Sequence, residues 1–96
     1  MIIKFKQPVA ADILAEERAT MAVSPMQGIL TLGETAWNSV LAYRDDPATP
    51  WAQRVIIDSA QDWHRNSQNM MFIGHILGYT DDQMDDLFRR AIAVVA

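Results

Sequence analysis

The sequence predicts an all-α fold, a compact bundle of four or five helices in a single domain that spans residues 1–96. Three observations predict this class. Apolar residues recur at intervals of three and four through most of the chain, which is the spacing of one helix face. Three stretches match the capping box that starts a helix, a Ser or Thr followed three residues later by Gln or Glu. Strand-like alternation is confined to residues 1–9.

The composition restricts the classes of function. Twelve acidic residues outnumber eight basic ones, the formal net charge is −4, and the basic residues are scattered along the chain. Nucleic-acid binding normally needs a clustered positive face, so we expect no nucleic-acid partner. The absence of cysteine removes disulfides, thiolate metal sites and thiol nucleophiles. The first 23 residues contain no continuous apolar run, so we expect no signal peptide, no membrane span and a cytoplasmic location.

Residues 1–9 are predicted to form an extended N-terminal arm. Ile3 and Phe5 alternate with two lysines, as in a half-exposed strand, and a proline ends the pattern. No other stretch of the sequence resembles a partner strand. We therefore expect the arm to lie over the helices, to pair with a strand of another chain, or to be disordered.

Three helices are expected between the arm and the centre of the chain. Residues 10–23 form an amphipathic helical pattern that ends at Ser24. Ser24 and Gln27 make a capping box for a short helix. A second box, at residues 31–34, predicts a helix over residues 32–45 whose inward side carries Ala36, Trp37, Val40 and Leu41.

One long central helix is predicted over residues 50–77. Thr49 is a suitable N-cap, Pro50 fits the first helical position, and Gly78 suits a left-handed C-terminal cap. Without interruption this helix would be roughly 42 Å long. The polar run at residues 65–69 contains indifferent helix formers, so the alternative is a bend or break there that leaves two helices. The expected inward stripe comprises Ile56, Ala60, Trp63, Ser67, Met70, Gly74 and Leu77, with Trp63 and Met70 as core anchors.

A C-terminal helix is predicted over residues 81–95, folded back on the central helix as a helical hairpin. The third capping box, at residues 80–83, starts it, and its first turn is acidic, which the helix dipole favours. On its surface we expect two i,i+4 ion pairs, Asp85 with Arg89 and Asp86 with Arg90.

The sequence shows no catalytic, cofactor-binding or metal-binding pattern. His64 and His75, the two histidines, would lie about 16 Å apart on one helix, too far to share a metal ion. The aspartates of residues 81–86 lack the alternating ligand pattern of an EF-hand. There is no phosphate-binding loop, dinucleotide fingerprint or strained nucleophile turn. We therefore expect a protein that is not an enzyme.

Protein binding is the activity that the sequence favours. Residues 70–77 are apolar nearly all round, which is typical of the most buried part of a fold or of a flexible Met-rich surface that grips another protein. The predicted protein-interaction residues belong to the arm, to this apolar segment and to the acidic helix start: Ile3, Phe5, Met70, Met71, Phe72, Ile73, Asp81, Asp82, Asp85 and Asp86.

The C-terminal half combines a hydrophobic run, the turn Leu77-Gly78-Tyr79 and a short acidic helix over residues 81–88. In this respect residues 50–91 resemble small helical proteins encoded in phage and prophage gene clusters. The resemblance implies a virion, tail-assembly or host-modulating role, and a location in a virion or in the cytoplasm of a bacterial host. It implies no role for any single residue.

Three functional hypotheses follow. The first is a structural or assembly protein, a homo-oligomer that self-associates through the arm and an apolar helix face. The second is a small acidic inhibitor or adaptor that occupies a basic, nucleic-acid-binding site on a host protein. The third is a small-ligand pocket lined by Trp37, Trp63 and Met70.

Overall fold

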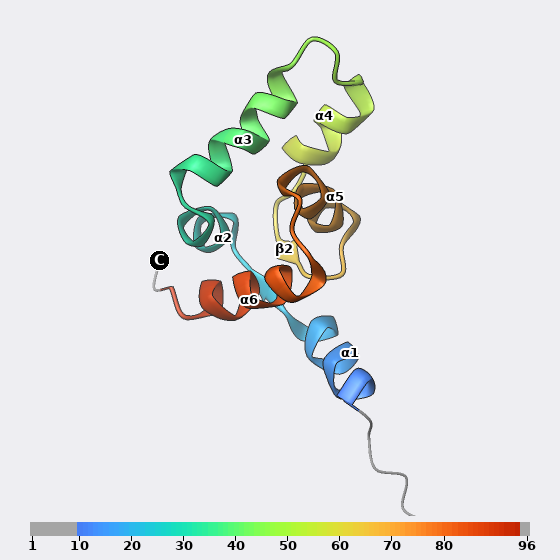
Figure 1. Ribbon diagram of the computed structural model, residues 1–96, viewed down its shortest axis with the longest axis vertical. Coiled ribbons are helices and arrows are strands. Elements are labelled where there is room, and N and C mark those ends of the chain that lie inside the picture. The colour runs from blue at the N-terminus through green and yellow to red at the C-terminus, as the bar shows by residue number, and fades with distance from the viewer. Residues whose placement is uncertain (1–9, 95–96) are drawn as a thin grey trace, which may run out of the picture.

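The computed structural model describes residues 10–94 and shows a mostly helical fold with one small antiparallel sheet (Figure 1). The predicted arm, with Ile3 and Phe5, lies outside the described residues. Within the described part there are six helices and two strands, and not the four or five helices of an all-α bundle: α1 Ala10–Thr20, β1 Ala22–Val23, α2 Pro25–Leu32, α3 Glu34–Asp45, α4 Trp51–Asp58, β2 Trp63–His64, α5 Gln68–Leu77 and α6 Asp81–Ile92.

The prediction of one long central helix is wrong. The helical segment α4 ends at Asp58, and α5 begins only at Gln68. Between them β2 pairs antiparallel with β1, so that Trp63 lies opposite Val23 and His64 opposite Ala22. This pairing supplies hydrogen-bond partners to the backbone between α4 and α5. In an unbroken helix these backbone groups would have bonded to one another within the helix. The predicted weak point at residues 65–69 is therefore real, but the interruption begins earlier, directly after α4.

Local capping signals predicted several helix ends correctly. Ser24 and Thr80 each form a reciprocal capping box, with Gln27 and Gln83 respectively. Gly78 ends α5 in the left-handed conformation, at φ 70°. These ends were predictable because each depends on contacts within four residues of sequence.

Two other predicted caps are wrong because their hydroxyls bond elsewhere. The Thr31 hydroxyl donates to the Gln27 carbonyl one turn back, so α3 starts at Glu34 after Gly33, with no side-chain cap. Thr49 is buried and its hydroxyl donates to the Tyr43 carbonyl, so Pro50 takes the cap position of α4. The first helix likewise stops at Thr20, three residues early, because the next residues form β1.

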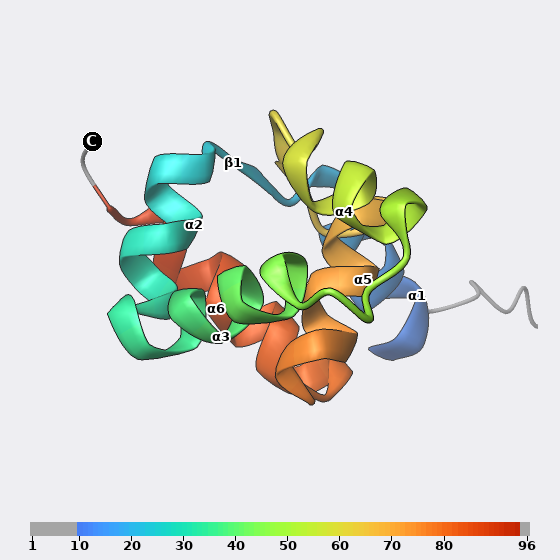
Figure 2. The same cartoon turned by 90° about the horizontal axis from the view of Figure 1, so that it is seen from above.

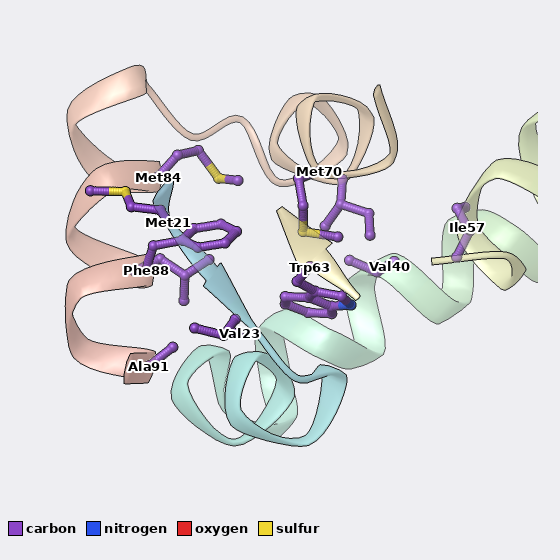
Figure 3. Packing of buried hydrophobic residues seen from close by; sticks show 11 residues of the cluster. Met21, Val23, Val40, Ile57, Trp63, Met70, Met84, Phe88 and Ala91 are labelled. Atoms are coloured by element: carbon purple, nitrogen blue, oxygen red, sulfur yellow. The ribbon is translucent and has the colours of Figure 1, made fainter. Parts of the chain in front are cut away.

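The core lies where the small sheet meets α2, α3, α5 and α6 (Figure 3). Trp63 from β2 and Met70 from α5 are both almost fully buried, which confirms them as core anchors. Phe88 and Ala91 of α6 pack into the core next to the sheet, and Val40 of α3 packs into it from another side. Figure 2 shows α4 lying against α5, whereas Figure 1 shows α1 extending away from the other helices at one end.

Among the glycines of the chain, Gly28 lies closest to a neighbouring side chain, that of Trp63. A Cβ atom at this position of α2 would lie 2.1 Å from Cε3 and 2.2 Å from Cζ3 of Trp63. The missing side chain therefore lets the indole ring of β2 lie directly on the backbone of α2. The contact fixes which edge of the Trp63 ring faces α2 and which edge faces away.

We predict that Gly28→Ala lowers the free energy of unfolding by about 1 to 3 kcal/mol, because the added methyl group overpacks a rigid ring. Helix propensity alone predicts the opposite, a gain of about 1 kcal/mol. The measurement is urea unfolding followed by circular dichroism.

Gly74→Ala is the matched control, because its Cβ would meet the flexible thioether of Met84, with Sδ at 2.9 Å. We expect a smaller loss there, since a methionine side chain can move aside. A Gly28→Ala variant as stable as the parent would contradict the packing argument.

Candidate functional site

The four aspartates predicted as interaction residues at the start of α6 differ in how far they are buried. Asp85 is only 1% exposed, and its carboxylate accepts hydrogen bonds from two arginines. Arg18 of α1 donates from Nε at 2.9 Å and from Nη2 at 2.8 Å, and Arg65 donates from Nε at 2.8 Å. Asp85 thus has no surface to offer a partner, and three of the four predicted acidic residues stay exposed, Asp81, Asp82 and Asp86.

The ion pairs differ from those expected along α6. Asp86 and Arg90 do pair at i,i+4, at 2.8 Å. Arg89, however, does not pair with Asp85; it donates to Glu17 of α1 at 2.7 and 2.9 Å. The sequence could not show this exchange of partners, because Glu17 lies 72 residues away along the chain.

Arg65 is the residue whose role sequence reasoning missed most clearly. In an unbroken helix it belongs to an exposed charged stripe, whereas here it is 4% exposed. Its Nη2 donates to the Asp81 carbonyl and carboxylate at 3.3 Å, and its backbone N–H donates to the Met21 carbonyl at 3.0 Å. Arg65 therefore ties the segment after β2 to both α6 and β1.

The two arginines hold the pKa of Asp85 below its usual range. The hydrogen bonds from Arg18 are the largest cause, and burial opposes them by disfavouring the charged form. The hydrogen bond from Arg65 acts in the same direction as those from Arg18. A carboxylate that is buried, charged and doubly paired is a structural element of the fold.

The four apolar residues 70–73 also differ in burial, because successive residues of a helix point in different directions. Met70 and Ile73 point into the core and offer no surface to a partner in this conformation. Met71 is 63% exposed. Phe72 is half-buried and meets the ring of Tyr43 edge-on, with centroids 6.0 Å apart. Only Met71 and Phe72 are thus accessible among the four.

These two residues border an apolar surface that continues onto α4. We call it the α4–α5 surface, and its residues beyond the two on α5 are Trp51, Ala52, Val55 and Ile56 of α4. On α4 these four share the outer side, opposite the buried Ile57, because positions four apart lie above one another. Trp51 is 77% and Val55 41% exposed. Sequence reasoning did not single out either of them.

A groove of about 430 Å³ lies within the α4–α5 surface. Ile56, Met71 and Phe72 supply its apolar wall, and amide side chains supply its polar groups. None of its lining residues is charged. They are Gln53, Ile56, Asn66, Gln68, Met71 and Phe72.

The predicted tryptophan pocket exists in part. Trp37 and Trp63 lie with their ring centroids 5.9 Å apart and their planes tilted by 41°. Both line a cavity of about 190 Å³, whereas Met70 is not among the residues that line it.

The two histidines lie apart in the structure and belong to no cluster of metal-ligating side chains among residues 10–94. His64 and His75 are both exposed, on β2 and α5. Across residues 10–94 no three His, Asp or Glu side chains converge as metal ligands. No described helix is long and apolar enough to cross a membrane.

Comparison with protein-family models, with curated protein sequences and with solved structures finds no match to this chain. The resemblance of residues 50–91 to phage-encoded proteins stays a prediction. The functional argument therefore depends on the geometry described above.

We predict that Asp85→Asn lowers the free energy of unfolding by about 3 kcal/mol at neutral pH, because it removes the closer and buried anion of Arg65 and leaves that guanidinium only the more distant carboxylate of Asp81. The matched control is Asp86→Asn, which removes an exposed pair and should cost about 0 to 1 kcal/mol.

The stability that Asp85→Asn loses relative to the parent should become smaller as the pH falls. Asp85 has a lowered pKa in the folded state, so its stabilisation is complete above the unfolded pKa of about 3.9 and disappears as pH falls through the folded value. The difference between parent and Asp85→Asn in urea unfolding should therefore shrink in acid. A difference that stays constant from neutral pH to about pH 3 would contradict this assignment.

Proposed function

We propose that the protein is a non-enzymatic interaction protein that self-associates through the α4–α5 surface. The observations that carry the proposal are the exposure of Trp51 and Val55 on α4 and the exposed Met71 of α5, which lines an uncharged groove. Exposed apolar residues that cluster around a groove mark binding surfaces, and tryptophan is enriched among the residues that dominate binding energy.

A second copy of the chain suits this surface because of its charge. In a twofold symmetric interface each patch meets an identical patch, so any net charge on the patch faces a like charge. The chain as a whole carries a formal charge of −4, but the groove lining is neutral. The groove therefore offers two acidic molecules a contact in which no charged residue of the lining meets a like charge.

The shape of the surface also suits self-association. A symmetric interface is self-complementary, so a group that protrudes from one copy can fill a recess of the other. Here Trp51 protrudes from the first turn of α4, and the recess lies between Ile56 of the same helix and Phe72 of α5. The amides of Gln53, Asn66 and Gln68 line the same recess and can donate to and accept from backbone groups of the second copy.

The acidic-inhibitor hypothesis has less support than self-association. Burial removes Asp85 from the acidic patch, and Asp86 is paired with Arg90. Asp81 and Asp82 are the exposed carboxylates left at the start of α6. An assembly role in a virion or tail agrees with self-association and with the resemblance of the C-terminal half, and it belongs to the same proposal.

We predict a dimer in light scattering coupled to size-exclusion chromatography, with a population that increases with concentration. Trp51→Ala should weaken dimerisation about 30-fold or more, the effect of losing a dominant interface residue worth about 2 kcal/mol. Met71→Ser should act in the same direction.

Leu30→Ser is the matched control, because Leu30 of α2 is equally apolar and 61% exposed but lies outside the α4–α5 surface. It should leave the dimer intact. A parent protein that stays monomeric at all concentrations, or a dimer that Leu30→Ser weakens and Trp51→Ala does not, would overturn the proposal.

Salt distinguishes a dimer held by apolar contacts from a dimer held by charged groups. The dimer should persist at about 0.5 M salt, where electrostatic screening acts over a few ångströms, because no charged residue lines the groove. Dimerisation lost under those conditions would indicate that charged groups hold the copies together, contrary to this proposal.

A further inference from the structure

A second cavity, of about 190 Å³, lies beside Trp63. Its walls come from α2, α3, α4 and the start of β2, and Ile57, the buried residue of α4, is part of them. It is separate from the groove, with which it shares no lining residue. The residues that line it are Pro25, Ile29, Trp37, Arg44, Ile57, Asp58, Ala60 and Trp63.

The orientation of the Trp63 ring directs its N–H group toward this cavity. The Cε3–Cζ3 edge lies on Gly28 of α2, and the pyrrole nitrogen is at the other end of the indole. Figure 3 shows that nitrogen on the side of the ring that faces Val40 and Ile57. Ile57 lines the cavity, so the N–H group points to the same side as the cavity wall formed by α4.

The indole N–H of Trp63 is not sealed off in the protein interior. Trp63 is 1% exposed, and none of the side-chain hydrogen bonds among residues 10–94 has its indole nitrogen as donor. The one side-chain nitrogen or oxygen in this part of the chain that is sealed off without a partner is Nε of Arg54. The Trp63 nitrogen is not among these sealed-off atoms, so it is left accessible beside the cavity that Trp63 lines, and an acceptor placed there can pair with it.

The rest of the cavity defines the body of a ligand. Trp37 presents a second aromatic ring, and Ile29, Ile57 and Ala60 add apolar walls. The charged residues of the lining are Arg44 and Asp58, which pair with each other at 3.4 Å and are partly exposed. The lining therefore has no net charge, and an uncharged ligand fits it better than an ion does.

We infer that this cavity binds a small, uncharged aromatic molecule whose hydrogen-bond acceptor pairs with the indole N–H of Trp63. Its volume exceeds the roughly 150 Å³ of an engineered apolar cavity that holds benzene, so it accommodates one ring with a short polar substituent. Acetophenone has this chemistry, with a planar ring and one carbonyl acceptor. The inference is independent of self-association, because the α4–α5 surface contributes no residue to the cavity.

The test is a titration with acetophenone followed by proton–nitrogen correlation spectra of the full chain. The three tryptophans give three indole N–H signals, which single Trp→Phe variants assign. The Trp63 signal should shift downfield and saturate, whereas the signal of the exposed Trp51 should stay in place. Absence of a saturable shift at Trp63 up to the solubility limit of acetophenone would overturn the inference.

Ethylbenzene separates the hydrogen bond from the filling of space, because it has nearly the same shape and no acceptor. We expect it to bind about tenfold more weakly, without the downfield shift at Trp63. Benzoate should also bind more weakly, because it brings a charge into a cavity without net charge. Equal affinity for acetophenone and ethylbenzene would exclude the role assigned to the N–H group.

Ala60→Leu tests the location, because the larger side chain occupies the cavity from its wall. It should lower the affinity for acetophenone at least about tenfold. Ala42→Leu, on the exposed side of α3, is the matched control and should bind as the parent does. Unchanged binding by Ala60→Leu would show that acetophenone binds elsewhere, and the ligand comparison in the parent protein tests the inference even if Ala60→Leu does not fold.

Discussion

The arrangement of the molecule depends on one buried carboxylate. Asp85 of α6 is held by Arg18 of α1 and by Arg65 of the segment after β2, so three parts of the chain that are distant in sequence meet at one anion. A buried charge is tolerated only when it is paired, so the buried position of Asp85 depends on these arginines. The same Arg65 donates its backbone N–H to Met21 beside β1, which joins the ionic contact to the sheet.

The position of Arg65 also explains why the central helix is interrupted. Its side chain reaches α6 from a turn, and the two residues before it pair with β1. The interruption lets α5 pack against α4, which creates the groove, and it places Trp63 beside α4, where the separate cavity lies. Both proposed binding sites are thus consequences of a helix that does not continue.

The sequence predicted what local chemistry determines. The capping boxes at Ser24 and Thr80, the left-handed Gly78 and the core positions of Trp63 and Met70 are all as expected. The break after Asp58 was not predictable in the same way, because helical spacing continues through it and the competing partner, β1, lies about 40 residues earlier. For the candidate sites, the apolar run named Met71 and Phe72 but could not separate them from the buried Met70 and Ile73, and the sequence could not show that α4 leaves Trp51 uncovered.

The contacts of α1 give the molecule two levels of cooperativity. No described residue of α1 belongs to the buried core, and Ile13 is 55% exposed, so this helix is attached to α6 by charged groups, Glu17 with Arg89 and Arg18 with Asp85. Ionic contacts weaken with salt and acid, whereas apolar packing does not. Detachment of α1 therefore has its own free energy, smaller than that of global unfolding, and its amide protons exchange with solvent through a local opening that leaves the rest of the fold intact.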